Sequence, residues 1–106
     1  MSDTPTISTH VLDTQHGRPA EGVAVQLLRV ADGGEEIVGG GTTDADGRIR
    51  RLLDGPLAAG QYRIEFRLVG PFFGSFSASF RVVDLERSYH VPLLMSDYSM
   101  STYLGS

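Results

Sequence analysis

The segment Tyr62-Arg63-Ile64-Glu65-Phe66-Arg67-Leu68 alternates apolar and charged side chains without interruption. A period of two puts the apolar residues on one face of a β-strand and the charged residues on the other, whereas a helix would scatter both kinds around its axis. Gly70-Pro71 follows and ends the pattern. We therefore predict a strand over 62–68 that packs one face into a core and shows the other to solvent.

The chain on both sides of this strand carries the same kind of pattern. Downstream, Phe76, Ala78, Phe80 and Val82 alternate with polar residues, which predicts that these four face inward. Other short apolar or alternating runs predict further strands, at 7–13, 23–28, 35–43, 48–53, 89–95 and 101–104. Clusters rich in Gly and Asp predict turns between them, at 15–19, 32–34 and 44–47. We expect the turns at 32–34 and 44–47 to close hairpins.

Seven or eight short strands in 106 residues are typical of one small all-β domain. We predict a single domain over 1–106, an antiparallel β-sandwich with little or no helix.

The composition excludes several classes of function. The chain has no cysteine, which rules out disulfides, thiol nucleophiles and cysteine-ligated metals. All nine basic residues are arginine, so a Schiff-base or P-loop lysine is also excluded. A net charge of −4 argues against nucleic acid as a partner, and no apolar run approaches the ~20 residues of a membrane span. Met1–Thr6 lacks the features of a secretory signal, so we expect a cytoplasmic protein.

Two histidines take matching positions in the predicted strands. His10 alternates with Val11 in 7–13, and His90 alternates with Val91 in 89–95. If the valines fill the core, both imidazoles point outward.

The same parity leaves Leu12 and Leu94 as exposed aliphatic residues beside the histidines, and contiguous apolar surface usually marks an interface. Pro92 cannot donate to a strand ladder, so it belongs at an edge or a bulge. We infer that another copy of the chain covers this face and that the histidines line a cleft between subunits.

Ordinary structural interpretations are favoured for several other residues. His16 lies in a turn and is interpreted as structural or solvated. Asp44 and Asp46 resemble a calcium loop only superficially, because the closing glutamate is absent. Arg48 by default is an exposed arginine of a hairpin. No Gly-x-Ser-x-Gly elbow is present, Ser106 is a poor nucleophile candidate, and two histidines lack an obvious third ligand for zinc.

Four segments resemble the signature segments of one family, the 5-hydroxyisourate hydrolases, which are the enzymatic relatives of transthyretin. These segments are Ser8-Thr9-His10-Val11-Leu12-Asp13 with Gly17-Arg18-Pro19-Ala20, Thr43-Asp44-Ala45-Asp46-Gly47-Arg48, Tyr89-His90-Val91-Pro92-Leu93-Leu94, and Ser101-Thr102-Tyr103-x-Gly105-Ser106. They stand in family order and span nearly the whole chain. The resemblance implies a transthyretin-like sandwich that assembles as a homotetramer, a dimer of dimers, with active sites in clefts between dimers.

The resemblance also implies an activity on a small heterocyclic substrate. The family opens a ring C–N bond of 5-hydroxyisourate, an unstable product of urate oxidation, and no metal or organic cofactor is implied. A neutral imidazole can deprotonate water near neutral pH, and an arginine can hold an oxyanion. Carried over by position, the implied catalytic residues are His10, Arg48, His90 and Ser106, and the implied substrate-binding residues are Tyr103, Leu104 and Gly105. Which histidine is the base stays open, as does whether Ser106 acts through its hydroxyl or its terminal carboxylate.

Several positions depart from the family pattern. Leu104 replaces an arginine, Ser88 stands where a further histidine is common, and Gly40 lies near the position of a usual tryptophan. The segment 97–100 also differs, and the family's short helix between 66 and 80 is missing. Two alternatives therefore stand beside a hydroxyisourate hydrolase. One is a divergent enzyme that uses the same cleft on another oxygenated heterocycle, for example in secondary metabolism. The other is a non-catalytic small-ligand carrier like transthyretin, against which the retained histidines argue.

Overall fold

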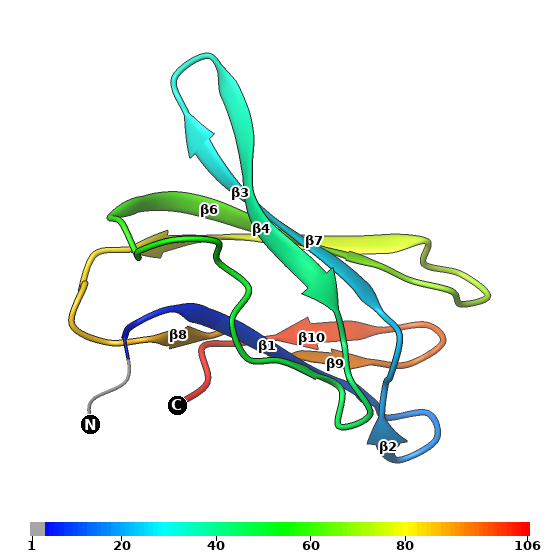
Figure 1. The fold of residues 1–106 in the computed structure, drawn as a ribbon. Helices are drawn as coiled ribbons and strands as arrows, with labels where there is room; N and C mark the ends of the chain where they lie inside the picture. Colours follow the sequence, from blue (N-terminus) through cyan, green and yellow to red (C-terminus); the bar gives the residue numbers. More distant parts are fainter. Residues whose placement is uncertain (1–3) are drawn as a thin grey trace.

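Two β-sheets lie face to face in the computed structural model, which describes residues 4–106 (Figure 1). The strands in chain order are β1 (Ile7–Asp13), β2 (Arg18–Pro19), β3 (Ala24–Ala31), β4 (Gly34–Thr42), β5 (Arg48–Ile49), β6 (Gly60–Arg67), β7 (Ser75–Val82), β8 (Tyr89–His90), β9 (Leu93–Met95) and β10 (Met100–Thr102). The predicted β-sandwich is confirmed, and the described residues form no helix. The expectations for Met1–Thr6 and for a domain over 1–106 include residues 1–3, which lie outside the described residues.

The first sheet has the order β4-β3-β6-β7, and every pairing in it is antiparallel. The alternation that predicted β6 appears directly in its burial. Tyr62, Ile64 and Phe66 are at most 1 % exposed, and Arg63 pairs with Glu35 on the other face at an Nε–Oε2 distance of 2.7 Å. The strand prediction for this segment is confirmed, with both ends shifted by one or two residues.

The second sheet has the order β10-β9-β1-β2, and the short strands β5 and β8 also pair with β1. Strand β1 runs antiparallel to β2 and β5 but parallel to β8 and β9. The antiparallel expectation is therefore corrected for this sheet, which is mixed. A parallel pair needs a long connection, and here the whole first sheet lies between β1 and β8 in the chain.

The core fills the space between the sheets. Its members come from both sheets and from the segment that follows β5, and those at most 1 % exposed are Ile7, Val11, Leu27, Leu52, Tyr62, Ile64, Phe66, Val82 and Leu93. The apolar residues of β7 were predicted to face inward, and they do: Val82 is buried, and Phe76, Ala78 and Phe80 pack against the core while half-buried. An edge strand explains the partial burial, because β7 has a neighbour on one side only.

The predicted strand over 48–53 is wrong beyond its first two residues, and the predicted hairpin at 44–47 is also wrong. The turn itself forms, but it carries the chain from β4 in one sheet to β5 in the other. A tight turn is a local feature, whereas the partner of the strand that follows is chosen by long-range packing.

A close backbone contact explains where the chain goes after β5. The Gly40 N–H donates to the Leu52 carbonyl at 2.9 Å, and Gly39 forms an isolated bridge with Leu53. A Cβ atom on Gly39 would lie 1.8 Å from the Leu52 carbonyl oxygen, so only glycine permits this approach. The glycine run in β4 thus lets the 52–54 segment cover the edge of the first sheet.

The predicted strand over 89–95 is interrupted at Val91-Pro92, which separates β8 from β9. Proline lacks the N–H that a ladder requires, so the break falls where the sequence indicated an edge or a bulge. Within residues 4–106 there is no helix with the length and apolar character needed to cross a membrane.

Candidate active site on the outer face of β1

His10 and Arg48 lie opposite each other on paired strands. Strand β5 runs antiparallel to β1, and these two residues are Cα partners in the register. Side chains of directly opposed residues project to the same face, with Cβ atoms roughly 5 Å apart. Both residues are half-buried. The pairing therefore places an imidazole and a guanidinium side by side on the outer face of the second sheet.

The turn before β5 determines where Arg48 sits. The Asp44 carboxylate accepts the N–H of Asp46 at 2.9 Å and the N–H of Arg48 at 3.0 Å. Gly47 has a φ of 76°, and a Cβ atom there would lie 2.5 Å from the Val11 carbonyl oxygen. The Gly47 carbonyl in turn accepts the Val11 N–H at 2.7 Å. Glycine thus lets the turn pack against β1, and the Asp44 carboxylate caps the backbone of the turn.

His90 reaches the same face through β1. Strand β8 pairs in parallel with β1, and Ser8 is the register partner of His90. Because Ser8 and His10 are two residues apart on one strand, they share a face, and His90 shares it with them. Val11 and Val91 are 0 % and 7 % exposed, so the predicted outward orientation of both histidines is confirmed.

Two contacts hold the His90 imidazole. The Ser8 Oγ lies 2.9 Å from its Nδ1. On the other side, Gly105 forms a bridge with His90, and its N–H donates to the His90 carbonyl at 2.7 Å. A Cβ atom on Gly105 would lie 2.7 Å from the Cδ2 of the ring. The C-terminal segment, which returns to β8 in Figure 1, therefore packs its backbone against the imidazole.

The surroundings of His90 lower its pKa. Burial has the largest effect, followed by the positive charge of Arg48 and then by His10. Each of these disfavours the imidazolium. With an ordinary value near ~6.5, a lowered pKa keeps His90 neutral at neutral pH. A neutral imidazole can accept a proton from water, and the guanidinium of Arg48 beside it can stabilise a negative charge that develops there.

Leu12 and Leu94, predicted to be exposed beside the histidines, are register partners in β1 and β9 and are half-buried. They extend the same outer face with apolar surface.

The other predicted site residues lie along the C-terminal segment. Tyr103 and Leu104 are 55 % and 57 % exposed, and they line an apolar groove of about 250 Å³ together with Phe80 and Val91. Ser106 is exposed and follows Gly105 directly. The structure thus brings His10, Arg48, His90 and Gly105 together, and it places Tyr103 and Leu104 on a groove between β7 and the C-terminal segment.

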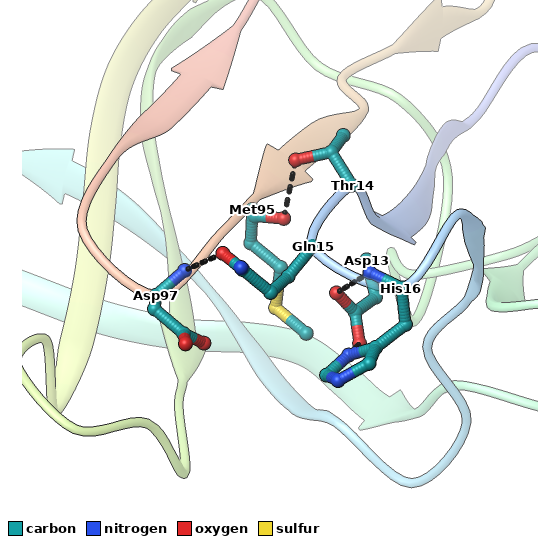
Figure 2. Close-up of polar contacts among 6 residues, drawn as sticks. All are labelled: Asp13, Thr14, Gln15, His16, Met95 and Asp97. Carbon is teal, nitrogen blue, oxygen red and sulfur yellow. Dashed lines mark hydrogen bonds and ion pairs between the residues drawn. The ribbon is translucent and has the colours of Figure 1, made fainter.

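His16 belongs to a different polar cluster, shown in Figure 2. Its N–H donates to Asp13 Oδ1 at 3.1 Å, and its Nδ1 lies 2.8 Å from Asp13 Oδ2. The Thr14 hydroxyl donates to the Met95 carbonyl at 2.9 Å, so the cluster ties the turn after β1 to the end of β9. This arrangement agrees with a structural role for His16. Among residues 4–106, no three His, Cys, Asp or Glu side chains gather in a way that could hold a metal ion.

Sequence reasoning did not single out Ser8 as part of the site. The signal was present, because Ser8 precedes His10 by two residues and shares its face. What the sequence lacked was the register between β1 and β8, which joins residues 82 positions apart.

Comparison with known proteins identifies the family of the chain. A family model described as HIUase/Transthyretin matches residues 7–105. The chain belongs to the HIUase/Transthyretin family. Within this family, the 5-hydroxyisourate hydrolase of Deinococcus radiodurans is 40 % identical, with all of both chains covered. The resemblance drawn from the four sequence segments is confirmed.

Solved structures of the HIUase/Transthyretin family agree with the fold. The 5-hydroxyisourate hydrolase of Klebsiella pneumoniae superposes with a TM-score of 0.82 at 33 % identity, covering 96 % of this chain and 99 % of that one. A sea bream transthyretin, solved in complex with thyroxine, also has a TM-score of 0.82, at 31 % identity and 93 % coverage of both chains. The fold is therefore similar to that of a hydrolase and of a transthyretin.

Proposed function

We propose that this protein is a 5-hydroxyisourate hydrolase, which opens a ring C–N bond of its substrate in urate breakdown. The observation that carries the proposal is the convergence of His10, Arg48 and His90 on one outer face of β1. The 40 % identity to a full-length 5-hydroxyisourate hydrolase supports the choice of substrate. A carrier has no chemical need for two imidazoles and a guanidinium at one place.

Each group has a role in adding water across a cyclic amide. A neutral imidazole takes a proton from water while the oxygen attacks the ring carbonyl carbon. The Arg48 guanidinium stabilises the negative charge that forms on the carbonyl oxygen. When the C–N bond breaks, an imidazolium returns one proton to the leaving nitrogen. The sum is one water consumed, with its hydroxyl on carbon and its hydrogen on nitrogen.

We assign the base role to His90, because its lowered pKa leaves it unprotonated at neutral pH. His10, opposite the guanidinium, then orients the water or protonates the leaving nitrogen. Gly105 and Ser106 close the end of the site beside His90, and Tyr103 and Leu104 take part in substrate binding where the C-terminal segment borders the cleft. The chemistry requires no cofactor.

We further propose that the active protein is a cytoplasmic homotetramer, a dimer of dimers. The groove that Leu104 lines beside β7 is mostly apolar and open, and Leu12 with Leu94 adds apolar surface next to the histidines. Surfaces of this kind are suited to burial against another copy of the chain. Sedimentation equilibrium tests the assembly: a mass four times that of the 11.5 kDa chain is expected, and a monomer mass would contradict it.

A direct assay tests the activity. The substrate is generated in situ from urate with a urate oxidase, and its ultraviolet decay is followed with and without the protein. We expect clear acceleration, reduced by roughly 10²- to 10⁴-fold in His90→Ala or His10→Ala. His16→Ala is the matched control, because this histidine bonds to Asp13 away from the site, and it should retain activity.

The same assay separates the alternatives. Absence of acceleration by a correctly assembled tetramer would contradict the hydrolase and favour either a divergent heterocycle hydrolase or a carrier. Leu104→Arg then distinguishes these two, since a gain of hydroxyisourate hydrolysis indicates an enzyme whose substrate changed with Leu104. The chain is similar to a transthyretin as well as to hydrolases.

A further inference from the structure

Ser8 is a polar residue whose side chain contacts the His90 imidazole. Its Oγ lies 2.9 Å from His90 Nδ1, within hydrogen-bond distance. The two residues are register partners in the parallel β1–β8 pair, so the contact is imposed by the sheet. A side chain this short on a strand has little freedom to move away.

The opposite side of the ring is also occupied. Gly105 lies so close that a Cβ atom would be 2.7 Å from Cδ2. Backbone on one side and a hydroxyl at Nδ1 together leave Nε2 as the ring nitrogen available to a reactant. The orientation of the imidazole is therefore determined from two directions.

A neutral imidazole carries one proton, on either Nδ1 or Nε2, and only the other nitrogen can act as a base. A hydroxyl beside Nδ1 can accept the Nδ1–H bond, and it continues to accept that bond after Nε2 takes up a proton. If Nε2 carried the proton instead, the lone pair of the ring would lie on Nδ1, against Ser8, and not on the nitrogen that is available to a reactant. The Nδ1–H tautomer places the lone pair on Nε2.

We propose that Ser8 is a positioning residue that accepts the Nδ1–H of His90 and so presents the Nε2 lone pair to the reacting water. The catalytic consequence rests on the proposed function, whereas the tautomer is a property of the protein alone. Ser8 touches no substrate atom in this scheme; it acts through the imidazole.

Imidazole ¹⁵N chemical shifts of His90 test the tautomer without any substrate. In the wild-type protein at a pH where His90 is neutral, we expect Nδ1 to carry the proton. In Ser8→Ala we expect a mixture of both tautomers, and in Ser8→Thr, which keeps a hydroxyl, the wild-type pattern. A protonated Nε2 in the wild type, or identical shifts in wild type and Ser8→Ala, would overturn the proposal.

Kinetics then connect the tautomer to the reaction. Ser8→Ala should lower kcat about 5- to 30-fold with little change in KM, and Ser8→Thr should recover most of the loss. Ser77→Ala, which removes an exposed strand hydroxyl from β7, is the matched control and should match the wild type. If the wild type itself fails to hydrolyse the substrate, the proposed function fails, while the ¹⁵N result still decides the role of Ser8. An altered tautomer with unchanged kcat would overturn the catalytic role.

Discussion

Gly105 lies against the imidazole of His90, although the two residues belong to different segments of the chain. The Gly105 N–H donates to the His90 carbonyl at 2.7 Å, and the ring occupies the space that a side chain at 105 would need. Two segments of the chain therefore share one small volume, and the glycine is what allows it.

Gly105→Ala should displace the imidazole, because the new methyl group would lie 2.7 Å from ring Cδ2. A misplacement near 1 Å at a reacting group costs on the order of 100-fold in rate, so we expect kcat/KM to fall by about that factor. Gly55→Ala is the control, since a Cβ atom there meets nothing within 4 Å. Equal rates for the two variants would show that the contact does not position the ring.

Arg48→Gln should raise the pKa of His90. Burial is the main cause of the lowered value and would remain, but the second cause, the charge of Arg48, would be removed. An NMR titration of His90 measures the change. Arg81→Gln removes an exposed arginine of β7 and should leave the titration as in the wild type. An unchanged or lower pKa in Arg48→Gln would contradict the assigned proximity of the two groups.

The activity of the wild type should persist to a pH below ~6.5. A base must be unprotonated, and the pKa of His90 is lowered, so the acid limb of kcat/KM should lie on the acid side of an ordinary histidine. The pH profile of kcat/KM checks this. An acid limb above that value would exclude His90 as the base whose protonation limits the rate.

Asp13 should contribute stability that is lost in acid. The side-chain hydrogen bond with His16 is the largest cause of its lowered pKa (Figure 2). Because the folded value is below the unfolded one, the unfolded chain binds more protons as the pH falls. The contribution is complete above the ordinary value near ~4 and is lost as the pH falls through the folded pKa.

Urea denaturation at pH 7 and at pH 3 measures this effect. Asp13→Asn should be less stable than the wild type at pH 7, and the difference should shrink at pH 3. Glu36→Gln, at an exposed position of β4, is the matched control and should show little change at either pH. A difference for Asp13→Asn that does not depend on pH would contradict the assignment.

Ile64→Ala should lower the free energy of unfolding by about 2 to 5 kcal/mol, because its side chain is 0 % exposed between the sheets and the variant leaves a cavity. Ile37→Ala makes the same chemical change at a residue that is 62 % exposed and should alter stability by only about 0.5 kcal/mol. Similar losses of unfolding free energy in both variants would show that Ile64 is not part of the core.

Much of the fold could be predicted because alternation is a local property. The charged and apolar positions of 62–68 and the parity of His10 and His90 depend only on the strand period, and both predictions are confirmed by burial. The prediction of a hairpin at 44–47 was wrong because the turn chemistry of that segment is compatible with a following strand in either sheet. The path of the chain after this turn depends on the glycine contact with Leu52, which no local pattern reveals.

The amino-acid sequence by itself determined which side chains face the core and which face outward, because that choice follows from residue type and strand period. Tertiary structure alone decided which outward residues meet. Arg48 faces His10 through the β1–β5 register, and Ser8 faces His90 through a parallel pairing across 82 residues. Register between distant strands is a property of the packed sandwich, since it is selected by the fit of both sheets at once.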